Sequence, residues 1–243
     1  MKIIGIIPAR YASTRFPGKP LVDIAGKSMI QRVYEQATKS KVLSKVVVAT
    51  DDARIYDHVK NFGGAVVMTD SAHQSGTDRC AEVIAKEDEL WDVAINIQGD
   101  EPFIYPEQID SVADCFTDDT IQIATLVKEI KNQHELLNVN MPKVIFNNRK
   151  QAIYFSRSPI PYNRNLPVEE WLKNYTYYKH IGIYAYRTAV LKQLTKLPIS
   201  GLEKTEALEQ LRWIENGYSI NVEVTNYEST AVDTPEDLLK LPV

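Results

Sequence analysis

The chain has 243 residues, of which 44% are hydrophobic and 25% are charged, a composition that is ordinary for a globular protein. A chain of this length can bury a sizeable core in one large domain, without disulfides or metals to hold it together. The formal net charge of −4 argues against a dedicated nucleic-acid-binding protein, but it is compatible with a local basic pocket. No apolar run approaches the roughly 20 residues that a membrane span needs, so we expect no membrane insertion.

The two cysteines, Cys80 and Cys115, are too few for a disulfide framework. Both lie in segments with a helical pattern, so we expect buried free thiols and a reducing, cytoplasmic location. The short apolar run at the N-terminus lacks the length and the small-residue cleavage site of a signal peptide, and it is interpreted as a first strand.

The first half of the chain alternates short apolar runs with helical patterns. The predicted strands cover 2–8, 45–50 and 92–98, and the predicted helices cover 28–40, 52–62 and 77–88. The apolar runs are nearly continuous in Val, Ile and Ala, which is typical of parallel strands buried on both faces. This half therefore predicts an α/β fold, a three-layer α/β/α sandwich with a mostly parallel, Rossmann-like sheet.

The second half has a different pattern. Residues 121–128 alternate apolar and polar side chains, residues 142–156 resemble a hairpin, and residues 176–187 are aromatic and β-branched. Further elements are expected as a helix over 200–216, a strand near 222–225 and a terminal helix from Thr234. We expect this half to form a smaller mixed β extension of the same sheet, carrying a substrate lid, within a single domain over 1–243.

A basic segment follows the first predicted strand directly, with the sequence PARYASTRFPGKP. Ligands of α/β sheets bind beyond the carboxyl ends of the strands. Arg10, Arg15 and Lys19, together with backbone N–H groups, could hold a triphosphate there, and Gly18 permits close approach. A solvated basic loop is the alternative, and the position after the first strand favours the phosphate site.

An acidic segment, NIQGDEP, closes the third predicted strand and should face the same crevice. Mg²⁺ prefers carboxylate oxygens combined with substrate phosphates, which suits Asp100 beside Gly99. A simple turn carboxylate is the alternative, because Gly-Asp pairs are common in turns.

Other polar residues carry weaker signals. Ser75 or Thr77 could cap the next helix, whose N-terminus favours anions, and a structural cap is the stronger interpretation. Asp233 precedes a helix start, where an acid is more often a cap or turn residue. Arg157 follows a strand and could clamp a substrate carboxylate. His180 lies in an apolar strand pattern typical of a core histidine.

Glu209 and Gln210 lie off the apolar stripe of their predicted helix, so they face either solvent or a pocket. No Cys/His cluster in the sequence suggests zinc, and no hydrolase nucleophile motif is present.

Taken together, eight segments resemble the 3-deoxy-D-manno-octulosonate (KDO) cytidylyltransferases, a branch of the sugar nucleotidyltransferases. These segments are PARYASTRFPGKPL, ATDD, HQSGTDR, NIQGDEP, SRSPIP, HIGIYAY, LEQLRWIENG and VDTPEDL. They span nearly the whole chain, and HQSGTDR, QGDEP and LEQLR are the specific ones. The basic segment is shared more loosely with many sugar nucleotidyltransferases.

The resemblance implies that CTP and the acid sugar KDO give CMP-KDO and pyrophosphate, a step towards lipopolysaccharide. It also implies Mg²⁺ as cofactor and a cytoplasmic homodimer with CTP and KDO as its small-molecule ligands. Residues 1–120 would mainly bind the nucleotide, and residues 121–243 would mainly bind the sugar and form the dimer.

Carried over position by position, the resemblance assigns roles to individual residues. The nucleotide would be bound by Arg10, Arg15, Lys19, Ser75, Gly76 and Arg79. The catalytic residues would be Arg15, Lys19 and Asp100, and the metal ligands Asp100 and Asp233. The sugar pocket would be lined by Gln98, Arg157, His180, Tyr184, Glu209 and Gln210.

Three alternatives stay open at this point. The same chemistry could act on another acid sugar, such as 8-amino-KDO or a sialic acid. A glycosyltransferase that consumes a nucleotide sugar is disfavoured, because those folds usually carry an Asp-x-Asp motif where this chain has Gln98-Gly99-Asp100. A non-catalytic nucleotide sensor is disfavoured because Lys19 and Asp100 are both present.

Overall fold

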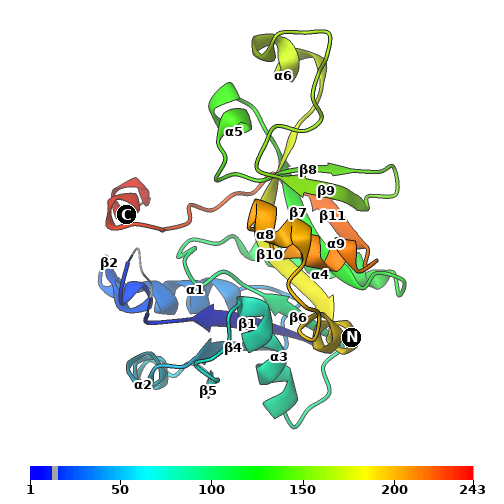
Figure 1. The fold of residues 1–243 in the computed structure, drawn as a ribbon. Coiled ribbons are helices and arrows are strands. Elements are labelled where there is room, and N and C mark those ends of the chain that lie inside the picture. Colours follow the sequence, from blue (N-terminus) through cyan, green and yellow to red (C-terminus); the bar gives the residue numbers. More distant parts are fainter. Residues whose placement is uncertain (13–15, 243) are drawn as a thin grey trace.

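The computed structural model describes residues 1–12 and 16–242 and arranges them around one central sheet (Figure 1). Its main strands lie in the order β11-β7-β10-β6-β1-β4-β5. Their bounds are β1 (Ile3–Ala9), β4 (Lys45–Thr50), β5 (Val66–Met68), β6 (Val93–Asn96), β7 (Ile123–Glu129), β10 (Tyr178–Arg187) and β11 (Ile220–Val224). The pairs β4–β5, β1–β4, β1–β6 and β7–β11 are parallel, whereas β10 runs antiparallel to both β6 and β7.

The register places the two central predicted strands on either side of β1. Ile6 is opposite Val47 of β4 and opposite Asn96 of β6, so β1 and β6 end at the same edge of the sheet. The β-branched residues of these strands are almost completely buried, as expected where helices cover both faces.

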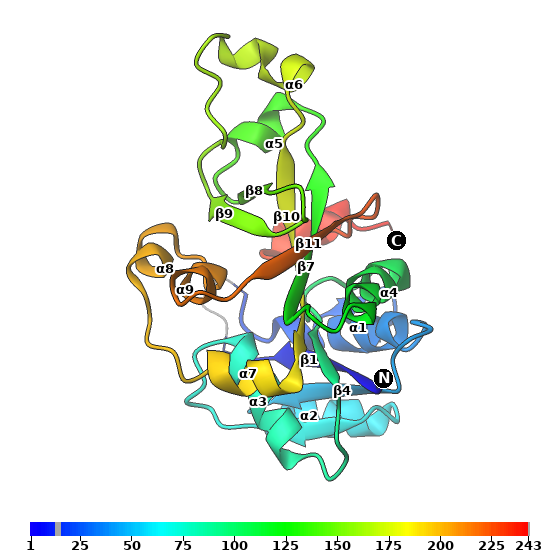
Figure 2. The same cartoon turned by 90° about the vertical axis from the view of Figure 1, so that its right-hand side faces the viewer.

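Helices cover both faces of the sheet (Figure 2). Residues of α1 (Met29–Ala37), α2 (Ala53–Asn61) and α4 (Pro106–Asp114) share one buried apolar cluster with the sheet. Residues of α3 (Gly76–Lys86), α7 (Thr188–Leu194), α8 (Gly201–Glu206) and α9 (Gln210–Glu215) contribute to a second cluster on the other face. The predicted three-layer α/β/α sandwich with a mostly parallel sheet is therefore confirmed.

A smaller extension projects from one end of the sheet, at the top of Figure 1. It contains the hairpin β8 (Lys143–Phe146) and β9 (Ala152–Ser156), α5 (Gln133–Leu137), the 3-10 turn η3 (Val168–Glu170), α6 (Trp171–Asn174) and the first part of β10. Its own small core consists of Ile130, Leu136, Trp171 and Tyr177. The predicted mixed β extension is thus present.

Short elements complete the fold. They are η1 (Lys19–Leu21), β2 (Asp23–Ile24), β3 (Lys27–Ser28), η2 (Cys115–Thr117) and η4 (Pro235–Lys240). Ser28, at the start of the helix predicted from residue 28, caps α1 with its hydroxyl, which accepts from the backbone N–H of Gln31 at 3.2 Å. Both cysteines are free thiols, as expected, but only Cys80 is buried, whereas Cys115 is partly exposed. Across the described residues, no helix has the length and apolarity needed to cross a bilayer.

One predicted element is wrong in its extent. The helix expected over 200–216 is divided into α8 and α9, because Ala207 adopts a left-handed backbone conformation with φ of 51°. The sequence pattern also does not predict β5, α4, α5, α6 or α7.

Candidate active site

The candidate site lies where β1 and β6 end side by side. The loop after β6 approaches β1 so closely that a Cβ at Gly99 would stand 2.6 Å from the backbone oxygen of Pro8. Such a separation is too short for any side chain, so glycine is required at position 99. The two predicted ligand-binding loops, basic and acidic, therefore meet at one edge of the sheet.

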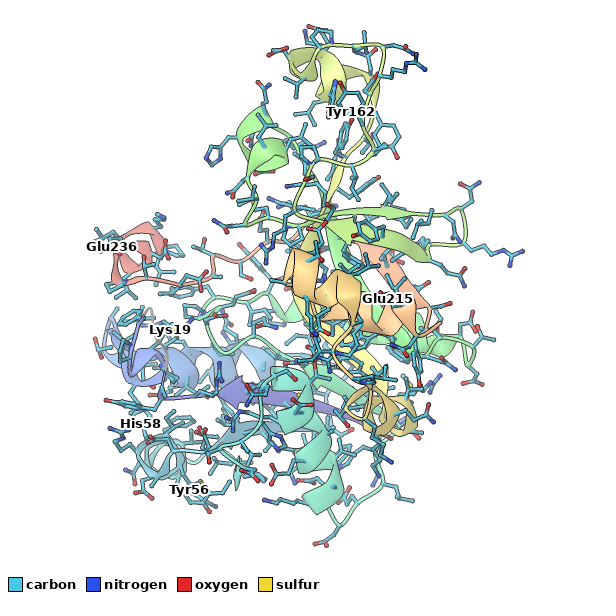
Figure 3. All side chains as sticks on the ribbon, viewed as in Figure 1. Lys19, Tyr56, His58, Tyr162, Glu215 and Glu236 are labelled. Carbon is cyan, nitrogen blue, oxygen red and sulfur yellow. The ribbon has the colours of Figure 1, made fainter. Side chains whose placement is uncertain are left out.

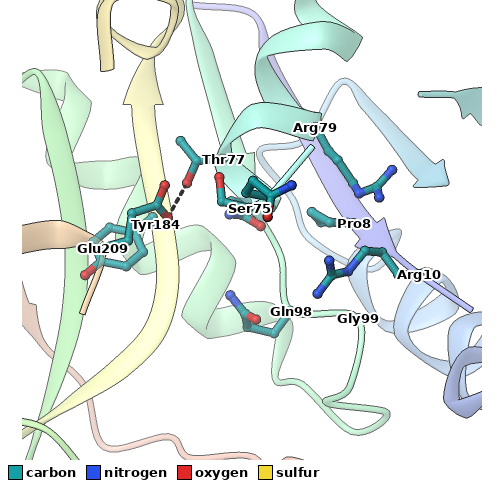
Figure 4. A pocket seen from close by; sticks show the side chains of 12 residues that line it. Pro8, Arg10, Ser75, Thr77, Arg79, Gln98, Gly99, Tyr184 and Glu209 are labelled. Atoms are coloured by element: carbon teal, nitrogen blue, oxygen red, sulfur yellow. Dashed lines mark hydrogen bonds between the residues drawn. The ribbon is translucent and has the colours of Figure 1, made fainter. Parts of the chain in front are cut away.

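A cavity of about 320 Å³ opens at this edge (Figure 4). It is lined by Pro8, Arg10, Gln74, Ser75, Gly76, Thr77, Arg79, Asn96, Gln98, Gly99, Tyr184 and Glu209. Figure 4 shows Arg10 and Arg79 towards one end and Tyr184 and Glu209 towards the other. The cations predicted for the nucleotide and two residues predicted for the sugar thus occupy opposite ends of one cavity.

The N-terminus of α3 forms one wall of this cavity. Ser75 and Asp78 make a reciprocal capping box, in which each side chain accepts from the other residue's backbone N–H. The structural cap that the sequence favoured is confirmed, and Ser75 also lines the cavity. A Cβ at Gly76 would crowd Asn96 and Pro8 at 3.3 Å, so this glycine lets the helix start lie against the strand ends. A helix N-terminus in this position favours a negatively charged ligand.

Arg79 lines the cavity, but its guanidinium is already engaged. It donates to Asp51 Oδ2 at 2.8 Å and to Thr69 Oγ1 at 2.7 Å, and its side chain is 1% exposed. The residue therefore fixes the segment before α3 and contributes positive potential, whereas the exposed Arg10 reaches into the cavity with a solvated charge.

A second cavity of about 250 Å³ adjoins the first and shares Pro8, Arg10, Gln98 and Gly99 with it. Lys19, Asp100 and Asp233 line it. The ammonium of Lys19 lies 2.7 Å from Asp100 Oδ2 and 3.9 Å from Asp233 Oδ1. Figure 3 shows Lys19 on the side of the molecule where the turn carrying Glu236 lies.

Asp100 and Asp233 come from distant parts of the sequence and converge on one ammonium. In proteins, Mg²⁺ is commonly bound by one or two carboxylates together with phosphate oxygens of a substrate and water. The residues present therefore fit the predicted magnesium site. Within the described ranges, no group of three or more Cys, His, Asp and Glu side chains has the geometry of an all-protein metal site. A metal here would need oxygen ligands from substrate and water as well.

Tyr184 reaches the cavity because β10 is irregular. The pairing of β10 with β7 shifts between Ile181 and Tyr184, which marks a bulge. Gln98 fastens this bulge to the loop after β6 by donating to the backbone oxygen of Gly182 at 2.6 Å. The amide oxygen of Gln98 makes no hydrogen bond with another described residue, and Figure 4 shows this side chain between the two ends of the cavity.

Glu209 lies just before α9 and contacts the start of α3. Its carboxylate accepts a hydrogen bond from Thr77 Oγ1 at 2.8 Å, drawn as a dashed line in Figure 4. Burial raises the pKa of Glu209, and the hydrogen bond from Thr77 opposes this shift. The pocket alternative for Glu209 is therefore the one that the structure supports.

Three residues predicted for the sugar do not line either cavity of the described structure. Arg157 donates to the backbone oxygens of Glu206, Val139 and Ala207, so it holds the break between α8 and α9. His180 contacts Thr125 at 2.9 Å and packs against Tyr184, and burial lowers the pKa of its imidazole to about 3.

Gln210 is the third of these residues, and its side chain is buried behind Glu209. Its amide nitrogen finds no hydrogen-bond partner among the described residues. Gln210 follows Glu209 directly and His180 packs against Tyr184, so these two residues support side chains that line the cavity.

The comparisons with known proteins agree with this geometry. The family model described as Cytidylyltransferase matches residues 4–222. A 3-deoxy-manno-octulosonate cytidylyltransferase of Parabacteroides distasonis is 59% identical, and the match covers 99% of this chain and 96% of that protein. The protein of the same name from Bacteroides thetaiotaomicron is 58% identical, with 98% and 96% covered.

The chain belongs to the 3-deoxy-manno-octulosonate cytidylyltransferase family.

A solved structure supports the same conclusion at the level of the fold. CMP:2-keto-3-deoxy-manno-octonic acid synthetase in complex with CTP superposes with a TM-score of 0.91 at 44% identity, covering 99% of this chain and 96% of that one. A 4-diphosphocytidyl-2C-methyl-D-erythritol synthase from Anaerococcus prevotii shares the fold only, at 13% identity and a TM-score of 0.62 with 98% and 96% covered.

One predicted site residue lies outside the described residues, and three residues that line the cavity were not predicted. Arg15, predicted to bind phosphate and to act in catalysis, falls in residues 13–15, which the structure does not describe. Gln74, Thr77 and Asn96 line the cavity but were not predicted as site residues. Thr77 could have been predicted, because it lies in the first turn of a helix whose N-terminus is expected to favour anions.

Proposed function

We propose that this chain transfers CMP from CTP to KDO, giving CMP-KDO and pyrophosphate and thereby activating the sugar for lipopolysaccharide assembly. The observation that carries the proposal is the pair of adjoining cavities. One combines cations and a helix N-terminus with Tyr184 and Glu209, and the other joins Lys19 to Asp100 and Asp233. Membership of the family supports the choice of CTP and KDO.

The nucleotide would occupy the cavity end that Arg10 and the start of α3 form. Arg10 and Lys19 would neutralise phosphate charge, and Gly76 would offer its backbone N–H group. Ser75 lines the same wall of the cavity, and the buried Arg79 would add positive potential. Arg15 would add a third cation to the phosphates.

The sugar would occupy the end of the cavity with Gln98, Tyr184 and Glu209. Its anomeric hydroxyl then lies on the opposite side of the α-phosphate from the leaving pyrophosphate. The hydroxyl oxygen forms a bond to the α-phosphorus, the bond to the bridging oxygen breaks, and the hydroxyl proton passes to solvent. Positioning and charge neutralisation supply most of the catalysis in such transfers.

Asp100 and Asp233 would hold Mg²⁺ against the phosphates. When bound, the metal neutralises phosphate charge and polarises the reacting phosphoryl group. The single ammonium of Lys19 cannot balance two carboxylates and a triphosphate together, which supports the proposed requirement for Mg²⁺.

Two further proposals follow from the family and from the extension. The chain forms a homodimer, supported by exposed apolar side chains on the extension, namely Leu137, Val139, Tyr162 and Tyr175; Figure 3 shows Tyr162 near its tip. It works in the cytoplasm, supported by the two free thiols. Light scattering coupled to size-exclusion chromatography tests the homodimer. A monomeric mass at micromolar concentration would refute it.

Substrate choice is tested by pyrophosphate release from purified protein with Mg²⁺. We expect release only when CTP and KDO are both present, and none when UTP replaces CTP. The same plate includes 8-amino-KDO and a sialic acid in place of KDO. Release with one of these sugars alone would keep the chemistry and correct the acceptor. No release with any combination would refute the enzymatic proposal and favour a nucleotide sensor. The glycosyltransferase alternative is already disfavoured, because the chain belongs to a cytidylyltransferase family.

A further inference from the structure

The segment between β11 and η4 crosses the molecule to bring Asp233 to the site, and we call residues 225–233 the C-terminal strap (Figure 1). Its far end is fixed at the candidate metal site. The backbone N–H of Val232 donates to the backbone oxygen of Asp100 at 2.9 Å, and Lys19 donates to the backbone oxygen of Val232 at 2.8 Å.

The middle of the strap lacks this kind of support. Thr225 continues the sheet by donating to the backbone oxygen of Val127 at 2.9 Å. Between 226 and 231, the strap makes no backbone-to-backbone hydrogen bond with any residue that the structure describes. Side chains must therefore determine its path, because an extended segment without a hydrogen-bonded ladder is free to shift.

Two successive side chains anchor the middle of the strap. Glu228 lies 2.6 Å from Lys179 Nζ of β10 and 3.2 Å from Lys128 Nζ of β7. Lys179 is 3% exposed, and its ammonium also lies 3.2 Å from Glu135 of α5. One buried lysine thus connects the strap to a helix of the extension.

Ser229, the next residue, binds to the loop after β6. Ser229 Oγ donates a short hydrogen bond to Glu101, a buried acid directly after Asp100. Glu228 and Ser229 therefore fix the strap both to the extension and to the loop that carries the first proposed metal ligand.

We propose that Glu228 and Ser229 are positioning residues that set where Asp233 stands relative to Asp100, with Lys179 linking this geometry to the extension. This inference rests on the magnesium site of the proposed function. In other metal sites, residues that orient the metal ligands are not ligands themselves, but their loss weakens metal affinity. Glu228 and Ser229 would act in this way on Asp233.

The test compares Glu228→Gln and Ser229→Ala with wild type and with a matched control, Glu223→Gln. Glu223 lies on β11, before the strap begins, and forms an ion pair with Lys150 that is more exposed than the pair of Glu228 with Lys179. Binding of Mn²⁺ in the presence of CTP is measured by electron paramagnetic resonance, without sugar and without turnover. We expect each strap variant to weaken Mn²⁺ binding by about tenfold and the control to bind within about twofold of wild type.

Two further readouts separate positioning from a general loss of structure. The Mg²⁺ concentration for half-maximal pyrophosphate release should rise in the strap variants, while the rate at saturating Mg²⁺ stays within about twofold of wild type. Hydrogen exchange should accelerate at the amides of 226–232 and not in β1 or β6. If Glu228→Gln fails to fold, Ser229→Ala carries the test, since it removes one hydroxyl.

The outcomes distinguish this inference from the proposed function. Wild-type Mn²⁺ affinity in both strap variants, together with weakened binding in Asp233→Asn, would overturn the inference and leave the metal site standing. Unchanged affinity in Asp233→Asn as well would overturn both. The identity of the sugar acceptor does not affect either result, because the titration contains no sugar.

Discussion

The two halves of the chain bring their groups to the site in different ways. In the first half, Arg10 directly follows β1 and Asp100 lies in the short loop after β6, so their positions depend on strand ends that the packed core holds rigid. In the second half, a bulge presents Tyr184, a left-handed residue precedes Glu209, and a strap delivers Asp233. Both sets converge on adjoining cavities.

This difference indicates how the work is divided. In the proposed orientation, the nucleotide triphosphate would lie at the rigid sheet edge. The sugar would lie against the irregular segments, whose geometry can change without disturbing the core. Substitutions at the sheet edge, at Gly99 or Asp100, should therefore affect both substrates, whereas those around Tyr184 and Glu209 should mainly affect the sugar.

The largest expected effect comes from Asp100→Asn, which removes a charge at the proposed metal and phosphate site. We expect kcat for pyrophosphate release to fall at least about a thousandfold at saturating Mg²⁺, corresponding to about 4 kcal/mol of lost transition-state stabilisation. The control is Asp57→Asn, on the exposed face of α2. Near-normal turnover of Asp100→Asn would show that this residue does not act on the metal or the phosphates.

The next largest effect tests the rigidity of the sheet edge. In Gly99→Ala, the new methyl group would clash with the backbone oxygen of Pro8, so the two loops must separate. We expect kcat/KM for both substrates to fall by about a hundredfold and stability to fall by about 1–3 kcal/mol. Gly201→Ala is the matched control, since its Cβ would meet only Glu215 at 3.8 Å. Equal behaviour of the two variants in kinetics and urea unfolding would contradict the close approach.

A smaller and more selective effect should follow from Thr77→Val, which keeps the side-chain shape but removes the hydrogen bond to Glu209. The buried carboxylate then loses its donor, and we expect KM for the sugar to rise about tenfold while KM for CTP changes less than about twofold. Thr38→Val, at an exposed helix end, serves as control. A larger change for CTP than for the sugar would reverse the proposed orientation of the substrates in the cavity.

The smallest effect concerns stability and pH at His180. Burial lowers the pKa of this imidazole from 6.5 to about 3, so between these values the unfolded chain binds more protons than the folded one. Its contribution to stability is therefore present above pH 6.5 and is lost as the pH falls towards 3. Between pH 7 and pH 5, wild type should lose about 2 kcal/mol more unfolding free energy than His180→Gln. Identical losses in urea titrations at the two pH values would show that His180 is accessible to protons in the fold.

The same contrast explains how far the sequence predicts the structure. The strand Lys45–Thr50 and the cap at Ser28 follow from local patterns, and so does the convergence of Asp100 with the basic loop. The break at Ala207 could not be predicted, because alanine favours helices and rarely adopts a left-handed backbone. The backbone carbonyls that Arg157 binds are assembled by that break.

Asp233 illustrates a further limit. Its local sequence indicates only a helix cap, and η4 does begin there with a capping box between Thr234 and Asp237. Its position near Lys19 depends on contacts made by the strap with distant residues. The family resemblance predicts a metal ligand at Asp233, whereas the local sequence pattern favours a cap or turn residue.

The central claim is that one site joins the α-phosphate of CTP to the sugar. The most direct measurement is mass spectrometry of the products from CTP, KDO and Mg²⁺, with pyrophosphate quantified in the same reaction. We expect CMP-KDO and pyrophosphate in equal amounts from wild type, and neither above background from Asp100→Asn. Pyrophosphate with free CMP and no sugar adduct, or no consumption of CTP, would contradict it.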